Sequence, residues 1–491
     1  MKVNVHMQSE ICGEDRHRSH DAGYFLPDES GTNNFKLSRT DFRGRVLDHS
    51  MRDFKSLGLL SFVFLFVMNM MGSGRAFAQA VSGRFVTSFY SYQQYDTTDA
   101  AKLDLRGFEA MQLNFGAGNY QLHTYILATN DFITPLPTDP LLRAGNLYLE
   151  ARNIGNVVDL KLGRQPIFSK VGVSSFDGLS ANAHFLNRQV SVIAFGGALP
   201  PIDERFELNS DLKNNTLYGG QVYYSPIENL RIGGAYIDKN FKPPSYYAYR
   251  LTDLHNTPSF GDSVYIDPSA TAYQFVSGDV LYYNKNVTGY LRIDYDLNFA
   301  DFNRTEFSFR YSPITSLSAN FEYFHRDARL PFNSIFSVFD HAGTDEYDLG
   351  VNYILANNVS AFASVSKVYY TGDNSTQYSI GTNIYLFSLN FSHNDGFAGN
   401  LNGLNAQFMY PLLERRIVLI ASASAMDYKI LQEISIPTNR LYSGSLGVTY
   451  RPIDLLSFNL QGQYYQNPVY KNDVRGYLQV NYYFFKSFDS N

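Results

Sequence analysis

The sequence repeats one short hairpin pattern at three places. In each copy a tyrosine ends an alternating segment, a proline follows two residues later and a leucine restarts the alternation, as in Tyr224–Leu230, Tyr311–Leu317 and Tyr450–Leu456. Proline cannot donate a hydrogen bond to a strand ladder and presets φ for a turn, so it lies where strand pairing stops. The pattern therefore predicts antiparallel hairpins whose tyrosines lie at the same end of their strands.

Two weaker copies, Tyr353–Val359 and Tyr410–Ile417, extend the same pattern. A ring of tyrosines at one level is typical of a membrane–water interface, because the ring is apolar and its hydroxyl is polar. The short turns all fall on one side, which is periplasmic in the usual barrel orientation. We therefore predict a periplasmic aromatic girdle made of Tyr224, Tyr311, Tyr353, Tyr410 and Tyr450.

The N-terminal part reads as targeting sequence. The apolar run 57–72 is shorter than the ~20 residues that span a bilayer, follows the charged segment Met51–Lys55 and precedes an Ala76-x-Ala78 cleavage pattern. We predict a signal peptide over 51–78, preceded by a non-native or disordered extension over 1–50. The single cysteine, Cys12, lies in that extension, so we expect no disulfide and no covalent haem attachment after it.

The remainder, 79–491, is a series of short segments with period two. Leu291 and Ile293 alternate with Arg292 and Asp294, for example. Alternation alone fits either a soluble sandwich or an outer-membrane barrel, but secretion, aromatic strand ends and the regular exchange of short and long connections favour the barrel. Because lipid tolerates no unpaired backbone, the sheet must close. We predict an all-β, transmembrane antiparallel up-and-down β-barrel of about 22 strands (20–24) with no plug domain.

Two segments resemble known families. The final strand, Tyr477–Phe485, alternates and closes on aromatic residues, and so resembles the C-terminal strand of Gram-negative outer-membrane β-barrels, although Lys486 to Asn491 follow it whereas the family usually ends on the aromatic. Leu162-Gly-Arg-Gln165 followed by Phe176-Asp-Gly178 resembles the strand–loop–strand of substrate-selective and alginate-type porins. The resemblance implies passage of a solute across the cell outer membrane, with membrane lipid and the barrel assembly machinery as partners.

Long connections on the outward side are candidates for narrowing the lumen. The largest, 238–272, carries the candidate constriction residues Tyr246, Tyr247, Tyr249 and Arg250. Loops of this length are usually functional or disordered. A second candidate is the shorter loop at 165–175.

Charged residues of both signs fall on the polar faces of the expected strands. We predict that ten of them line the lumen: Arg231, Arg292, Asp294, Asp296, Glu306, Arg310, Glu322, Arg326, Glu346 and Asp348. They form either a selectivity surface with a transverse field or wall salt bridges that hold neighbouring strands in register, and the second is favoured for any single residue.

The remaining chemistry is sparse. The histidines after the signal peptide occur singly, and none has a serine and an acid grouped with it in the sequence. The net charge is −6, and the charged residues are not clustered. We therefore expect no enzyme activity, cofactor, metal site or nucleic-acid partner. The leading hypothesis is a porin-like channel for passive diffusion of small polar solutes or ions. Two alternatives stay open: a sleeve around a periplasmic or lumenal multihaem cytochrome, and a surface adhesin or receptor barrel.

Overall fold

The computed structural model describes residues 80–95, 101–251, 260–328, 342–397, 399–429, 438–468 and 472–487. All of the described residues belong to one compact unit, Phe62–Asn491. The predicted extension (1–50) and signal peptide (51–78) lie outside the described residues. Within the described ranges no helix has the length and apolar character needed to cross a membrane.

The regular structure in this part of the chain consists of antiparallel strands. Their bounds are β1 Ala80–Tyr95, β2 Ala101–Ala117, β3 Tyr120–Asp131, β4 Leu141–Ile154, β5 Val158–Ser169, β6 Gly172–Phe185, β7 Val190–Ala198, β8 Thr216–Ile227, β9 Leu230–Phe241, β10 Tyr246–Leu251, β11 Phe260–Ile266, β12 Thr271–Tyr283, β13 Val287–Asp296, β14 Asp301–Ile314, β15 Leu317–Arg326, β16 Thr344–Ala356, β17 Val359–Tyr370, β18 Asp373–Ile384, β19 Phe387–Gly396, β20 Asn400–Leu412, β21 Ile417–Lys429, β22 Asn439–Ile453, β23 Leu456–Gln466 and β24 Asp473–Ser487.

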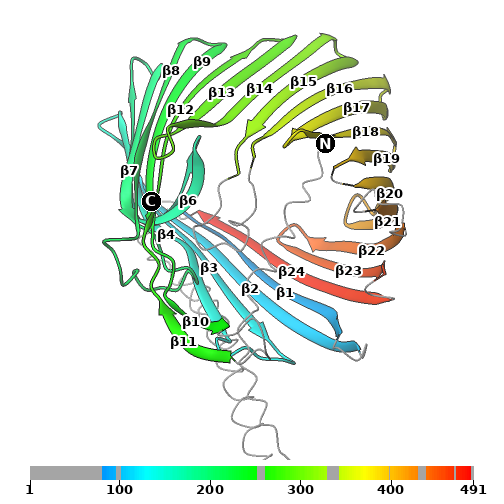
Figure 1. Ribbon diagram of the computed structural model, residues 1–491, viewed down its shortest axis with the longest axis horizontal. Helices are drawn as coiled ribbons and strands as arrows, with labels where there is room; N and C mark the ends of the chain where they lie inside the picture. Colours follow the sequence, from blue (N-terminus) through cyan, green and yellow to red (C-terminus); the bar gives the residue numbers. More distant parts are fainter. Residues whose placement is uncertain are drawn as a thin grey trace, which may run out of the picture. The chain divides into compact units, whose positions relative to one another are not determined.

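Twenty-two of these strands form one closed sheet (Figure 1). Each barrel strand pairs with the next along the chain, β9 pairs directly with β12, and β1 pairs with both β2 and β24. The closing ladder runs from Ala80 opposite Ser487 to Ser91 opposite Gly476. The predicted up-and-down barrel of about 22 strands is therefore confirmed. The two remaining strands, β10 and β11, pair only with each other and lie in the connection between β9 and β12.

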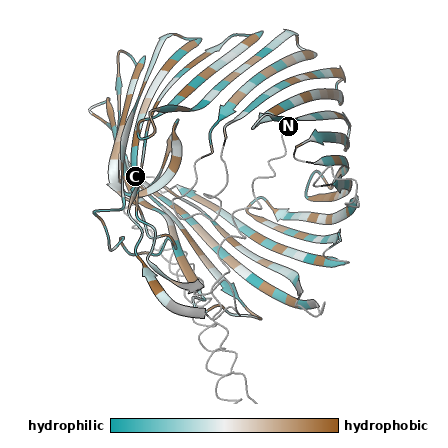
Figure 2. Cartoon of the chain, viewed as in Figure 1, coloured by the Kyte–Doolittle hydropathy of each residue, from teal (hydrophilic) through white to brown (hydrophobic). Residues whose placement is uncertain are grey.

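The two faces of the barrel wall differ in the way that period-two sequences require. On β13 the charged side chains of Arg292 and Asp294 are buried, while Leu291 and Ile293 between them are exposed. The same alternation runs along the other barrel strands (Figure 2). Phe309 is 39% and Leu460 59% exposed, which excludes a sandwich because a two-sheet core would bury both. Apolar side chains point outward to lipid, and polar ones point inward.

The strands extend further on the outward side than expected. β3 continues to Asp131, and β4 begins at Leu141. The expected loop at 165–175 is largely strand, because β5 continues to Ser169 and β6 begins at Gly172, and the two pair with each other up to the turn. Serine, glycine and proline in this segment have low strand propensity, so the sequence alone predicts a loop there. The strands form nevertheless because β5 and β6 pair with each other.

Glu109 is an exception on the outward face of β2. Its neighbours Phe108 and Ala110 point to the lumen side, where they line a cavity, so Glu109 points to the lipid. It lies seven residues before Gly116 at the turn between β2 and β3, which at ~3.3 Å per residue and a tilt of about 40° is roughly 18 Å from that turn. A carboxylate at this depth opposes membrane insertion.

We expect Glu109→Leu to raise the free energy of unfolding of the barrel in phospholipid vesicles by roughly 1–2 kcal/mol, because it removes a carboxylate from the lipid face. Denaturant titration of the folded barrel measures this change. Gln112→Leu, which alters the lumen face of the same strand, is the matched control and should bring no gain. An unchanged or lower stability for Glu109→Leu would contradict the outward placement of this residue.

Candidate functional site

Among the described residues, a hairpin between β5 and β6 folds into the lumen of the barrel (Figure 1). We call residues 164–177 the inward hairpin; it joins the end of β5 to the start of β6, with Gln165 opposite Phe176 and Ser169 opposite Gly172. At its tip, Lys170 Nζ lies 3.5 Å from Asp279 Oδ2 on β12 and donates to the Tyr290 hydroxyl on β13 at 3.3 Å. Four strands, β6 to β9, separate β5 from β12 in the sheet. Figure 1 shows the start of β6 within the ring of strands.

A row of three glycines lies where the hairpin leaves the wall. Gly163 on β5 is opposite Gly178 on β6, which is opposite Gly197 on β7. A Cβ on any of the three would come within 2.2–2.3 Å of a neighbouring backbone oxygen, and Gly163 has φ +125°. Only glycine permits this close approach and this backbone conformation. The glycine row therefore allows β5 and β6 to turn inward without breaking their pairing.

A buried ion pair holds the base of the inward hairpin. Arg164 Nε lies 2.7 Å from Asp177 Oδ1, and its Nη2 lies 2.8 Å from Oδ2 of the same carboxylate. The guanidinium also donates to the backbone oxygens of Glu204, Arg205 and Glu207 in the connection between β7 and β8. Two-point pairing with further hydrogen bonds is the arrangement that makes a buried ion pair tolerable. Arg164 therefore fixes the hairpin base to the neighbouring loop.

Apolar side chains hold the hairpin against the wall. One buried cluster joins residues of the inward hairpin to lumen-side residues of β7, β8 and β9 and to the start of the connection between β7 and β8. Its members are Ile167, Phe176, Phe195, Leu199, Leu217 and Ile237. On an open lumen wall these positions would carry polar residues, but here the inward hairpin covers them. Burying a side chain of this size stabilises by about 1.5–3 kcal/mol, so the cluster supplies much of the hairpin's attachment.

Charged and aromatic groups surround the hairpin tip. Asp279 is buried on β12 and lies 4.0 Å from Arg231 Nη2 on β9 as well as close to Lys170. The Lys170 ammonium is also 4.9 Å from the centroid of the Tyr290 ring. A Cβ on Gly233 would lie 2.2 Å from Asp279 Oδ1, so the glycine leaves room for this carboxylate. The tip is thus held by a cation between an anion and an aromatic face.

The opposite side of the tip is open and apolar. Phe168 and Val173 are cross-strand partners near the end of the hairpin. Their side chains are 71% and 68% exposed. Since the hairpin lies inside the barrel, these two side chains meet the lumen and not the lipid.

The predicted wall charges lie on the lumen face, and several of them pair along a strand. Arg292 Nε is 2.8 Å from Asp294 Oδ1, and Arg304 Nη2 is 2.8 Å from Glu306 Oε2. In both pairs the two residues are two apart on one strand. These two ion pairs lie within one strand, whereas Arg231 on β9 pairs with Asp279 on the neighbouring strand β12 at 4.0 Å.

The other predicted wall residues have separate surroundings. Arg231 belongs to the hairpin tip, and Asp296 accepts from the backbone amides of Asn298 and Phe299 in an outward turn. Further along the wall, the Arg326 guanidinium lies 5.7 Å from the Phe324 ring, Arg310 is opposite Asn320, Glu322 is opposite Asp348, and Glu346 accepts from Ser366.

The candidate constriction loop forms the β10–β11 hairpin. Tyr246 and Tyr247 lie in β10 together with Tyr249 and Arg250, and the Tyr247 ring is 5.1 Å from that of Tyr265. Figure 1 draws this hairpin outside the ring of barrel strands.

The base of the β10–β11 hairpin is closed by polar contacts outside the barrel wall. Ser245 donates to Asp267 at 2.6 Å, and Lys242 Nζ lies 3.1 Å from the same carboxylate. The hydrogen bond from Ser245, followed by that from Lys242, holds the pKa of Asp267 below its usual value.

The five predicted girdle tyrosines have nearly equal surroundings. Each lies two or three residues before the end of its strand, beside a short turn, and each is 42–45% exposed: Tyr224, Tyr311, Tyr353, Tyr410 and Tyr450.

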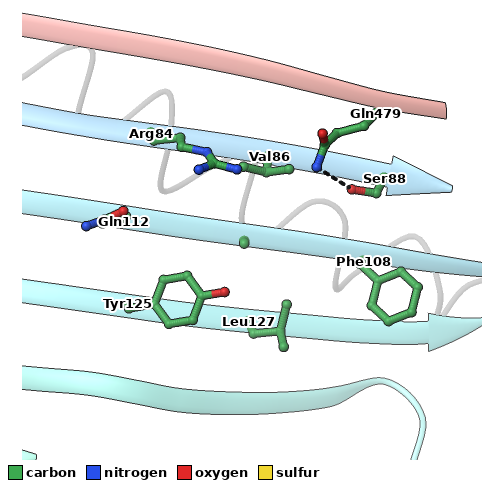
Figure 3. A pocket seen from close by; sticks show the side chains of 9 residues that line it. Arg84, Val86, Ser88, Phe108, Gln112, Tyr125, Leu127 and Gln479 are labelled. Atoms are coloured by element: carbon green, nitrogen blue, oxygen red, sulfur yellow. Dashed lines mark hydrogen bonds between the residues drawn. The ribbon is translucent and has the colours of Figure 1, made fainter. Parts of the chain in front are cut away.

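A shallow cavity of about 230 Å³ lies in the lumen wall of β24, β1, β2 and β3 (Figure 3). It is lined by Arg84, Val86, Ser88, Phe108, Ala110, Gln112, Tyr125, Leu127 and Gln479. The described residues contain no group of His, Cys, Asp and Glu side chains able to hold a metal ion.

A closed sheet with an apolar exterior and a polar, charged interior satisfies every condition for crossing a bilayer as strands. The chain is a closed antiparallel β-barrel of 22 strands. No protein-family model matches its sequence, and no curated protein matches it either.

Several solved structures resemble the barrel at low sequence identity. The P pilus usher PapC translocation pore has a TM-score of 0.44 at 9% identity, with 82% of this chain and 99% of that chain covered. OpdO of Pseudomonas aeruginosa has 0.39 at 12%, covering 83% and 97%, and OccAB3 of Acinetobacter baumannii has 0.37 at 10%, covering 83% and 99%. With TM-scores below 0.5 these likenesses carry no argument about function, which must come from the barrel's own lumen.

We expect Lys170→Met to loosen the inward hairpin, because it removes the cation that joins the tip to Asp279. Hydrogen exchange followed by mass spectrometry should show amides 166–175 exchanging at least about tenfold faster. Lys161→Met is the matched control, since Lys161 lies on the same strand and pairs with Glu150. Unchanged protection of 166–175 in Lys170→Met would mean that the ion pair does not hold the tip.

Proposed function

We propose that the barrel is a porin-like channel for passive diffusion of small polar solutes or ions across the outer membrane. The observation that carries the proposal is the inward hairpin. Twenty-two strands spaced ~4.8 Å apart and tilted about 40° enclose a lumen of roughly 20 Å radius. A lumen of that width needs an internal restriction to discriminate between solutes, and this chain supplies one from its own wall.

The hairpin is long enough to serve as that restriction. Seven residues separate Gly163 at the bend from Lys170 at the tip, a span of ~23 Å when extended. This length is comparable to the lumen radius, and the tip is fixed to Asp279 on the far side of four strands. A hairpin held at both base and tip narrows the lumen permanently.

The same element favours a channel over a sleeve. A cytochrome inside the barrel would need the space that the inward hairpin fills, and it would meet the exposed side chains of Phe168 and Val173. The charges on the lumen face of the described strands are of both signs, which supports weak selection among ions.

In planar bilayers the purified barrel should give discrete conductance steps. Replacing Pro166–Ser175 by a two-residue turn should raise the step size by at least about 1.5-fold, because it removes the element that narrows the lumen. Heat-modifiable gel mobility confirms that the variant is folded. Absence of discrete steps from the intact barrel would reject the channel, and an unchanged step size in the variant would reject the hairpin as its constriction.

The β10–β11 hairpin is tested in a separate variant. Replacing residues 242–270 by a two-residue turn preserves the paired residues Phe241 and Thr271. If Tyr246, Tyr247, Tyr249 and Arg250 form a second constriction, this deletion changes the conductance. An unchanged conductance would reject that loop as a constriction and leave the inward hairpin as the restricting element.

A further inference from the structure

Charge is distributed unevenly around the lumen. On the lumen face of β17 to β23, across the described residues between the end turns, the side chains are uncharged. Most carry a hydroxyl or an amide, as do Ser379, Asn390, Asn405, Ser422, Ser445 and Asn459. Asp373 and Arg451 lie at the outward and periplasmic ends of their strands. We call this surface the neutral wall.

The opposite part of the lumen has a different character. Strands β12 to β14 alone bring Asp279, Arg292, Asp294, Glu306 and Arg310 to the lumen face. The neutral wall is therefore not a general property of the barrel interior. It is confined to seven consecutive strands, and their outward faces alternate with it in the ordinary way, as the exposed Ile380, Leu404 and Leu446 show.

Short hydrogen bonds between strands hold the polar groups of the neutral wall in place. Ser379 donates to Asn390 at 3.0 Å, and Thr449 donates to Asn459 at 2.8 Å. The hydroxyls of Ser422 and Ser445 are 2.7 Å apart. Each hydroxyl or amide has more donor and acceptor capacity than one such contact uses. The neutral wall therefore presents an ordered set of hydrogen-bonding groups to the lumen without presenting charge.

We propose that the neutral wall binds uncharged, hydroxyl-rich solutes of the oligosaccharide class. The proposal rests on the channel function and names its solute class. A solute hydroxyl that exchanges water for a serine or asparagine gains about 0.5–1.5 kcal/mol per hydrogen bond, and no charge has to be desolvated. Many weak contacts spread over seven strands suit transport, because the solute is attracted to the lumen and still released from it.

The test uses maltohexaose, a neutral linear oligosaccharide, as a blocker of ion current through single barrels. Maltohexaose should reduce the current of the unmodified barrel in a concentration-dependent way. The triple variant Ser379→Ala, Ser422→Ala and Ser445→Ala should raise the half-blocking concentration about tenfold, since it removes three hydroxyls without changing charge. The matched control is Ser277→Ala, Ser308→Ala and Ser318→Ala, which removes three hydroxyls from the lumen face of β12, β14 and β15.

The outcomes separate this proposal from the channel function. Ion conductance without sugar reports on the channel, and equal conductance of all three proteins confirms that the variants are folded. A current that maltohexaose does not reduce would overturn the solute class while leaving the channel intact. Block that is equally weakened in both triple variants, or unchanged in the neutral-wall variant, would overturn the assignment to β17–β23.

Discussion

The pairing of the first strand with the last is the constraint on which the rest of this structure depends. An unpaired strand edge in lipid leaves backbone groups without partners at a cost of several kcal/mol each. The ladder between β1 and β24 removes that edge over twelve residue pairs, from Ala80 opposite Ser487 to Ser91 opposite Gly476. Once the sheet is closed, every strand has a lipid side and a water side, and the period-two sequence follows from that division.

The sequence alone predicts the barrel well because the signals that define each strand are local in the sequence. Alternation and the Tyr-x-Pro turns mark each strand and its ends, and these signals need no knowledge of distant residues. The inward hairpin was harder to predict, since alternation breaks off at Arg164 and Gln165 and only strand pairing reveals the glycine row. A signal was present in the apolar residues Phe195, Leu217 and Ile237, which break the polar pattern of the lumen face because the hairpin covers them.

The candidate site could be predicted only in part. Parity assigns the ten wall charges to the polar face of their strands, but their partners were not predictable: Lys170 contacts Asp279 across more than a hundred residues, whereas Arg292 contacts Asp294 on its own strand. The motif containing Arg164 and Asp177 was recognised by resemblance, and its physical role, a buried clasp at the hairpin base, required coordinates. The sequence of β17–β23 contains the uncharged polar residues of the neutral wall, but only the strand order shows that a charged surface lies on the opposite part of the lumen.

The glycine row makes the width of the open lumen independent of the architecture of the barrel wall, although the two are usually coupled. Elsewhere the bore follows from the number and tilt of the strands, so altering it means rebuilding the whole wall. Here Gly163, Gly178 and Gly197 form a pivot from which the hairpin departs while the cylinder continues undisturbed. Lengthening or shortening the hairpin beyond these glycines would therefore change the width of the open lumen while the number and tilt of the barrel strands stay the same.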